Sequence, residues 1–207
     1  MFCKAILSIR TCITQGSPTL FTPRMITEFL CKEKIQLAAI TDVNTCLNAP
    51  AFSICCKRHG ILALYGMEAW CRDRKALVLF SNLELAMDFN YAWYRTLPAD
   101  LPKDLHGQDP RQYCVDEDDG ILSVEKKYLQ VASPVSFNEL KKEVESKGGL
   151  VFKNEALPDR YKQPIEEIFQ LRKNFLDFDI GDCGLFSANE SINFQAIRTG
   201  FEKLQGS

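Results

Sequence analysis

Two patterns of apolar positions alternate along the chain. Short runs of consecutive apolar residues predict buried strands, and the longer stretches between them repeat their apolar residues with a helical period. The predicted strands span residues 4–9, 36–41, 61–65, 76–80, 150–153, 176–180 and 185–188. The predicted helices span residues 22–34, 48–59, 83–97, 136–148, 164–174 and 191–204.

Residues with strong terminal preferences mark several of these helices. Thr22 precedes a proline, which suits the first position of a helix. Ser136 and Glu139 have the spacing of a capping box. Gly60 follows the second predicted helix and is the residue type that most often ends one.

Strands that alternate with helices in this way predict an α/β domain with a parallel sheet. Closure into a barrel is the economical arrangement, although an open, doubly wound sheet fits the same pattern. We expect a single domain over residues 1–207. The Asp119-Gly120 turn predicts a hairpin, which we interpret as a loop insertion at about residues 98–130.

Composition narrows the classes of function. The net charge of −2 gives no sign of the basic face that a nucleic-acid binder uses, so nucleic acid is not an expected partner. No apolar run is long enough to span a membrane, and the first residues lack the apolar core of a signal peptide. We therefore expect a cytoplasmic protein whose nine cysteines are reduced thiols in the core.

Acidic residues follow two neighbouring predicted strands. Asp42 and Glu68 lie just beyond residues 36–41 and 61–65. In α/β-barrel enzymes the carboxyl ends of the strands carry the catalytic residues. This pair therefore marks the candidate functional end of the domain.

Five motifs in order resemble the polymerase and histidinol phosphatase (PHP) family, in particular a stand-alone bacterial branch of it. They are TDVN at 41–44, KRHGI at 57–61, YGME at 65–68, VDEDDGILSVEKKYL at 115–129, and GGLV at 148–151 followed by PDR at 158–160. The resemblance covers about residues 4–200. It implies a distorted seven-stranded, TIM-like β/α barrel. It also implies descent from metal-dependent phosphoesterases, whose active members bind two or three divalent metal ions and hydrolyse phosphate esters.

The resemblance also locates the metal-ligand positions, most of which are histidines in active members. The corresponding residues here are Ser8, Arg10, Asp42, Val43, Glu68, Lys75, Glu155 and Glu190. Glu68 is the one ligand clearly retained, and Asp42 matches a residue with a supporting role. Valine cannot bind a metal, and Arg10 and Lys75 bring positive charge where metal ions would lie. The resemblance therefore implies a pseudoenzyme that needs no cofactor.

Neither histidine of the chain restores the metal site. His59 ends a predicted helix, far from the carboxyl ends of the strands, and His106 lies in the long loop. Cys12 lies near the same end of the barrel but has no histidine nearby to act as its base. We therefore expect none of these three residues to be catalytic.

Three functions remain open at this point. The first is an inactive domain in which Arg10 and Lys75 neutralise Glu68, with Asp42 as a further partner, or simply extend into solvent. Such a domain acts as a binding or regulatory module for a protein or for a small anion held by Arg10 and Lys75. The second is a phosphoesterase with a rebuilt site in which Asp42, Glu68, Glu155 and Glu190 bind Mg²⁺, or in which Mn, Fe or Zn is bound. The third is RNA binding, as in a ribonuclease P subunit of related fold. A homo-oligomer is compatible with the fourteen phenylalanines.

Overall fold

A computed structural model of the chain describes residues 5–17, 21–99 and 111–153. The strands are β1 (Ala5–Ile9), β2 (Leu37–Val43), β3 (Leu62–Trp70), β4 (Lys75–Phe80), β5 (Tyr113–Val115), β6 (Ile121–Val124) and β7 (Leu150–Lys153). The helices are α1 (Pro23–Lys32), α2 (Ala49–His59), α3 (Leu83–Thr96) and α4 (Phe137–Ser146). All of the elements predicted before residue 154 are thereby confirmed, and those predicted at 164–174, 176–180, 185–188 and 191–204 lie outside the described residues.

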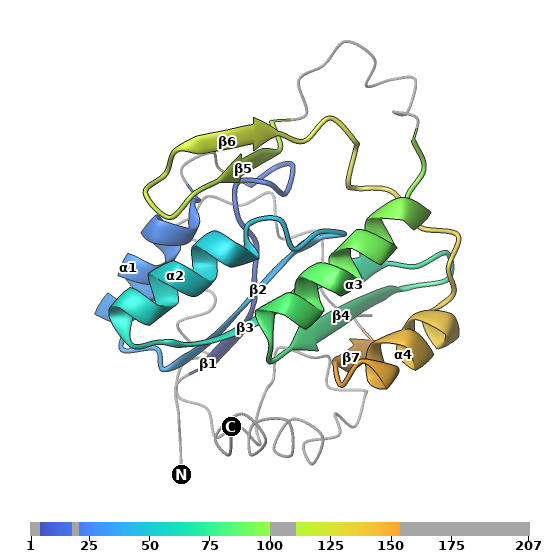
Figure 1. Cartoon of the computed structure of the whole chain (residues 1–207), viewed down its shortest axis with the longest axis horizontal. Coiled ribbons are helices and arrows are strands. Elements are labelled where there is room, and N and C mark those ends of the chain that lie inside the picture. The colour runs from blue at the N-terminus through green and yellow to red at the C-terminus, as the bar shows by residue number, and fades with distance from the viewer. Residues whose placement is uncertain (1–4, 18–20, 100–110, 154–207) are drawn as a thin grey trace.

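The described strands form one mixed sheet and one hairpin. The sheet has the order β1-β2-β3-β4-β7, while β5 and β6 pair only with each other (Figure 1). Strands β1, β2 and β3 are parallel, as predicted, but β4 is antiparallel to both of its neighbours. The prediction of a wholly parallel sheet is therefore wrong at β4. Residues 71–74 are too few for a crossover connection, so β3 and β4 can only pair as a hairpin.

The four helices pack on one face of this sheet (Figure 1). Each contributes its apolar side to the main core, as Ile26 of α1, Phe52 of α2, Phe89 of α3 and Leu140 of α4 show. A doubly wound sheet has helices on both faces. In the described part of the chain the helices therefore cover a single face of the sheet, and β1 to β4 lie side by side in sequential order.

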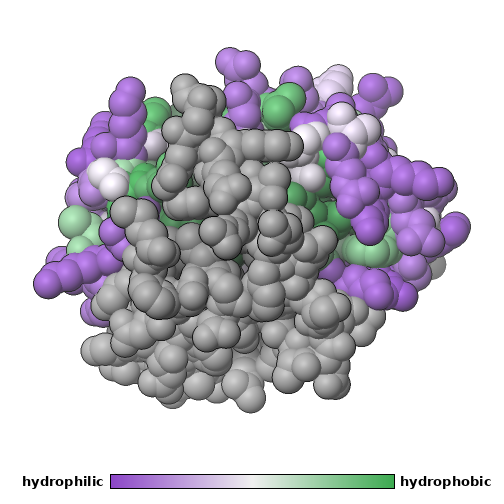
Figure 2. Space-filling view, turned by 90° about the horizontal axis from the view of Figure 1, so that it is seen from below, coloured by the Kyte–Doolittle hydropathy of each residue, from purple (hydrophilic) through white to green (hydrophobic). Residues whose placement is uncertain are grey.

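The opposite face of the sheet carries a second, smaller apolar cluster. Its members all come from strands: Leu7, Leu37, Ala39, Leu64, Leu77 and Leu79, with Leu150 and Phe152 at its edge. Both faces of the central strands are therefore apolar, which explains why the predicted strands are continuous apolar runs rather than alternating ones. In Figure 2 the described residues at the periphery are mainly hydrophilic. No described helix is long and apolar enough to cross a membrane.

The side chains of Thr22 and Ser136 cap their helices, as predicted. Thr22 accepts a hydrogen bond from the Met25 amide at 3.3 Å. Ser136 and Glu139 form the complete capping box. Asn48 stands at the start of α2, yet its side chain makes no capping bond, because it binds the β5–β6 hairpin instead.

Gly60 ends α2 in the left-handed conformation, with φ of 67°. A Cβ at this position would have no atom within 4 Å, so substitution acts through backbone strain alone. We expect Gly60→Ala to lower the free energy of unfolding by about 1 kcal/mol, measured by urea denaturation. Unchanged or increased stability would show that the left-handed cap is not needed.

Candidate functional site

The carboxyl ends of β1, β2 and β3 meet at one edge of the sheet. The parallel register places Val43 beside Glu68, and the antiparallel register places Trp70 beside Lys75. Because β4 runs in the opposite direction, its first residue lies at this same edge. The structure thus brings together six of the eight predicted positions: Ser8, Arg10, Asp42, Val43, Glu68 and Lys75. Glu155 and Glu190 lie outside the described residues.

A buried ion pair joins Arg10 to Glu68. Arg10 is 9% exposed and Glu68 is 1% exposed. The Arg10 guanidinium binds Oε2 of Glu68 through Nη2, and the indole Nε1 of Trp70 donates to Oε1 at 2.8 Å. Each oxygen of the buried carboxylate thus has a donor, and the predicted pairing of Arg10 with Glu68 is confirmed.

Lys75 does not share in this ion pair, so that part of the charge hypothesis is wrong. Its Nζ lies 4.0 Å from the centroid of the Trp70 ring. An ammonium over an indole face is a favourable cation–π contact. The same indole donates to Glu68, so Trp70 contacts both the lysine and the carboxylate.

Asp42 is a buried carboxylate that fastens the loop after β1 to the end of β2. The Thr11 amide donates to Oδ1 at 2.6 Å, the Thr11 hydroxyl to Oδ2 at 2.8 Å, and the Thr14 hydroxyl to Oδ1 at 2.7 Å. Burial raises the pKa of Asp42 from 3.8 to about 6, although these hydrogen bonds and the nearby Arg10 act in the opposite direction. Asp42 therefore holds the loop after β1 against the end of β2.

This raised pKa makes stability depend on pH. Between about pH 3.8 and 6 the folded state holds a proton that the unfolded state has released, so stability falls as the pH rises through this range. The loss reaches about 3 kcal/mol above pH 6. We expect Asp42→Asn to flatten this slope in unfolding curves recorded from pH 4 to 7. A slope equal to that of the wild-type protein would show that Asp42 ionises as readily in the folded chain as in the unfolded one.

Most of the described polar groups at this edge that could bind a metal are already hydrogen-bonded. Val43 is fully buried and has no ligating atom, and the Ser8 hydroxyl accepts from the Thr41 hydroxyl at 3.4 Å. The carboxylate oxygens of Asp42 and Glu68 are already bound by donors. Among the residues that the structure describes, no group of three His, Cys, Asp or Glu side chains could hold a metal ion.

Asn44 is the principal residue of the site that the sequence did not single out. Its Nδ2 donates to the carbonyls of Leu129 and Val131, both at 2.7 Å. Its Oδ1 accepts from the Trp70 amide at 2.8 Å and the Trp93 indole at 3.0 Å. Its φ of 54° is one that asparagine tolerates well. In the sequence, Asn44 appeared only as the last residue of the TDVN motif at 41–44.

Two further buried amides hold the chain segment around β5 and β6. Asn48 donates to the Tyr113 carbonyl at 3.1 Å and accepts from the Val115 amide at 3.0 Å. Gln112 donates to the carbonyls of Glu125 and Lys127 and accepts from the Leu129 amide. Asn48 therefore attaches the hairpin to the start of α2, and Gln112 joins the two ends of the hairpin segment.

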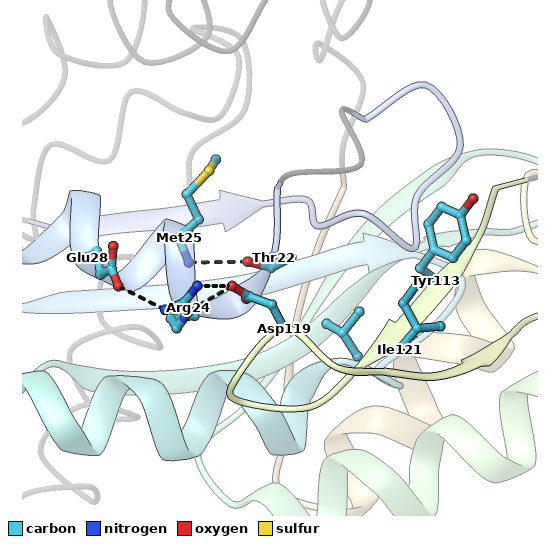
Figure 3. A pocket seen from close by; sticks show the side chains of 8 residues that line it. Thr22, Arg24, Met25, Glu28, Tyr113, Asp119 and Ile121 are labelled. Carbon is cyan, nitrogen blue, oxygen red and sulfur yellow. Dashed lines mark hydrogen bonds and ion pairs between the residues drawn. The ribbon is translucent and has the colours of Figure 1, made fainter.

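Ion pairs fasten the tip of this hairpin to α1 and α2. Arg24 pairs with Asp119, and Arg58 lies 2.9 Å from Asp118. A groove of about 480 Å³ lies between α1 and the hairpin (Figure 3). It is lined by Thr22, Arg24, Met25, Glu28, Tyr113, Val115, Asp119 and Ile121. Its Arg24 is already engaged by Asp119 and lies 4.0 Å from Glu28.

Cys12 is a buried thiol, and His59 lies at the end of α2. The seven described cysteines are all free thiols. Burial raises the pKa of Cys12 to about 12, so its thiol stays protonated and is a poor nucleophile. His59 is the exposed last residue of α2, as predicted, and His106 lies outside the described residues.

Comparison with known proteins gives no family assignment. No family model matches the chain, and no curated protein sequence matches it. Among solved structures, an amidohydrolase from Chromobacterium violaceum with bound sulfate and no metal has a TM-score of 0.47 at 14% identity, over 83% of this chain and 73% of the other. A protein described as a metal-dependent phosphoesterase from Bifidobacterium adolescentis has a TM-score of 0.45 at 17% identity, over 97% of this chain and 84% of the other. A lesion-specific endonuclease from Pyrococcus furiosus has a TM-score of 0.46 at 12% identity, over 86% of this chain and 40% of the other. At these values the likeness assigns neither a fold nor an activity to this chain.

Proposed function

We propose that this protein is a non-catalytic relative of the PHP phosphoesterases that acts as a binding or regulatory module. The observation that supports this most directly is the buried Arg10–Glu68 ion pair. Glu68 corresponds to the one metal ligand that the family resemblance retains, and a guanidinium occupies one of its two oxygens.

The chemistry of arginine explains why such a replacement ends catalysis. A guanidinium supplies the positive charge that a buried carboxylate needs, and it stays protonated at any ordinary pH. It cannot bind water and lower the pKa of that water, which is how a metal ion produces a hydroxide nucleophile. The Arg10–Glu68 pair therefore stabilises this end of the sheet without providing a route to hydrolysis.

The arrangement of the described elements is compatible with a barrel of the PHP type. Three parallel strands follow one another in order, and the four helices lie on one face, as in the wall of a β/α barrel. We propose that the remaining predicted strands, at residues 176–180 and 185–188, complete a distorted seven-stranded barrel.

The two cations predicted to bind a small anion are already engaged, which leaves a protein as the partner that we propose. Arg10 and Lys75 are the two cations predicted to bind an anion, but Arg10 is bound to Glu68 and Lys75 lies over Trp70. An anion would have to compete with a buried carboxylate for the guanidinium. Such competition costs several kcal/mol, because Glu68 would be left without its partner.

Metal analysis combined with a phosphoesterase assay tests this proposal. We expect the purified full-length chain to contain no stoichiometric Mn, Fe, Zn or Mg, and to hydrolyse neither p-nitrophenyl phosphate nor its diester when these metals are added. Stoichiometric metal, with turnover that Glu68→Gln abolishes and Glu84→Gln preserves, would instead establish the rebuilt carboxylate site. Glu84 is a suitable control because it is an exposed glutamate in the first turn of α3.

A further inference from the structure

Two buried cysteines from distant parts of the chain meet where the β5–β6 hairpin contacts the loop after β1. The Tyr113 amide donates to the carbonyl oxygen of Cys12 at 3.4 Å. The Cys12 thiol in turn donates to the carbonyl oxygen of Tyr113, with a sulfur–oxygen distance of 3.6 Å. Because Cys114 directly follows Tyr113, its backbone lies one residue from both contacts.

The two thiols also contact the same short segment at the start of α2. Nδ2 of Asn48 lies 3.8 Å from Sγ of Cys12. Sγ of Cys114 lies 3.8 Å from the carbonyl oxygen of Leu47, the residue before Asn48. Burial, the charge of Asp42 and, to a smaller extent, the Cys114 thiol raise the pKa of Cys12 to about 12. The shared neighbours and this electrostatic effect place the two sulfur atoms close to each other.

The backbone geometry suits a disulfide bond between these two residues. A disulfide requires Cα atoms within about 7 Å of each other. A backbone hydrogen bond between neighbouring segments sets the paired Cα atoms roughly 5 Å apart, so an offset of one residue keeps Cys12 and Cys114 within that limit. Such a bond would fix the hairpin to the loop after β1.

Both thiols are protected while the hairpin is closed. Cys12 is 1% exposed and Cys114 is 9% exposed, and burial raises the pKa of Cys114 as well. A buried, protonated thiol is inert toward oxidants. Strand β6, however, is exposed along its whole length, and parts of a fold with few buried contacts open before the rest. Opening would bring Cys114 into solvent, where its pKa returns toward that of an ordinary thiol and the reactive thiolate forms.

We propose that hydrogen peroxide oxidises Cys12 and Cys114 to a reversible disulfide, and that this bond holds the β5–β6 hairpin closed. In the open state the Cys114 thiolate attacks one peroxide oxygen and the O–O bond breaks, which leaves a sulfenic acid and a hydroxide that takes up the thiol proton as water. When the hairpin closes, the Cys12 sulfur attacks the sulfenic sulfur. The S–S bond then forms, and the sulfenic hydroxyl leaves with the Cys12 proton as a second water.

The redox state would thereby control how often the hairpin opens. A dithiol reductant reverses the reaction by thiol–disulfide exchange and releases the hairpin. Disulfides in a reducing compartment are usually transient and redox-sensing, which agrees with the free thiols of both cysteines in the structure. This inference uses only the hairpin and the segments that it contacts, so it does not rest on the proposed function.

Peptide mass mapping of the full-length chain tests the disulfide. The reduced protein is treated with hydrogen peroxide, its remaining thiols are alkylated, and it is digested without reductant. We expect a peptide pair linked through Cys12 and Cys114 that dithiothreitol separates. In the oxidised protein, hydrogen exchange at the Tyr113 amide should slow at least about tenfold, because the bond restricts the opening of the hairpin. Cys12→Ser and Cys114→Ser should each lose both effects.

Cys46→Ser is the matched control. Cys46 is 2% exposed and its thiol donates to the carbonyl oxygen of Gly66, so it is an equally buried cysteine outside the proposed pair. This variant should keep the disulfide and the slower exchange. Two results with the wild-type protein would overturn the proposal without reference to any variant. One is a Cys12 that peroxide links to Cys46 as readily as to Cys114, or to neither. The other is a Cys12–Cys114 disulfide that leaves exchange at the Tyr113 amide unchanged.

Discussion

Replacing Arg10 by methionine is expected to lower the free energy of unfolding by about 3 kcal/mol, with the midpoint of urea denaturation falling accordingly. Methionine fills much of the same volume but leaves the Glu68 carboxylate buried without its counter-charge. Removing one partner of a buried ion pair has costs of this size because the remaining charge cannot recover its hydration.

The double variant Arg10→Met/Glu68→Met separates the lost pairing from a general packing defect. With both charges gone, we expect stability to return to within about 1 kcal/mol of the wild-type protein. Arg24→Met serves as the control, because Arg24 and its partner Asp119 are both accessible to solvent. Its loss should cost no more than about 1 kcal/mol. A double variant as unstable as Arg10→Met would contradict this account.

The second large effect is expected at Asn44, where alanine should lower the free energy of unfolding by about 3 to 4 kcal/mol. The substitution removes four hydrogen bonds and leaves the Trp70 amide and the Trp93 indole without an acceptor in a buried region. Thermal or urea unfolding, followed by the fluorescence of these two tryptophans, measures the change directly.

Asn82→Ala is the matched control for this measurement. Asn82 caps α3 through a single exposed hydrogen bond to the Leu85 amide, and loss of such a cap costs about 1 kcal/mol. If the two alanine variants were equally stable, the hydrogen bonds of Asn44 would contribute nothing beyond those of an ordinary surface amide.

The sequence predicted local structure well because the signals for it are local. Thr22, Ser136 and Gly60 mark helix ends through interactions within a few residues, and the structure has all three. The direction of β4 was predicted wrongly because the pattern of strands and helices was extended across a connection of only four residues. The two predicted runs, residues 61–65 and 76–80, are separated by ten residues, and only the extension of β3 to Trp70 and the start of β4 at Lys75 shorten the connection to four.

The predictions of the site differ in the same way, because some of its contacts have a signal in the sequence and others depend on the fold. Arg10 and Glu68 could be paired from sequence because the family resemblance placed both among the former metal-ligand positions, and opposite charges attract. The contact of Lys75 with Trp70 depends on the antiparallel register that the prediction lacked. The partners of Asn44 include backbone carbonyls 85 and 87 residues away. Every residue has a backbone carbonyl, so the sequence does not indicate which ones a side chain will bind.

These long separations also bear on the order in which the molecule folds. The bonds from Asn44 and Asn48 to the segment around the hairpin span 65 to 87 residues, whereas β1–β3 with α1 and α2 form from neighbours in the sequence. Closing long loops is entropically costly, so contacts of this range form late. The hairpin segment is therefore the part expected to detach first in native-state hydrogen exchange. Asn44→Ala should accelerate unfolding more than it slows refolding.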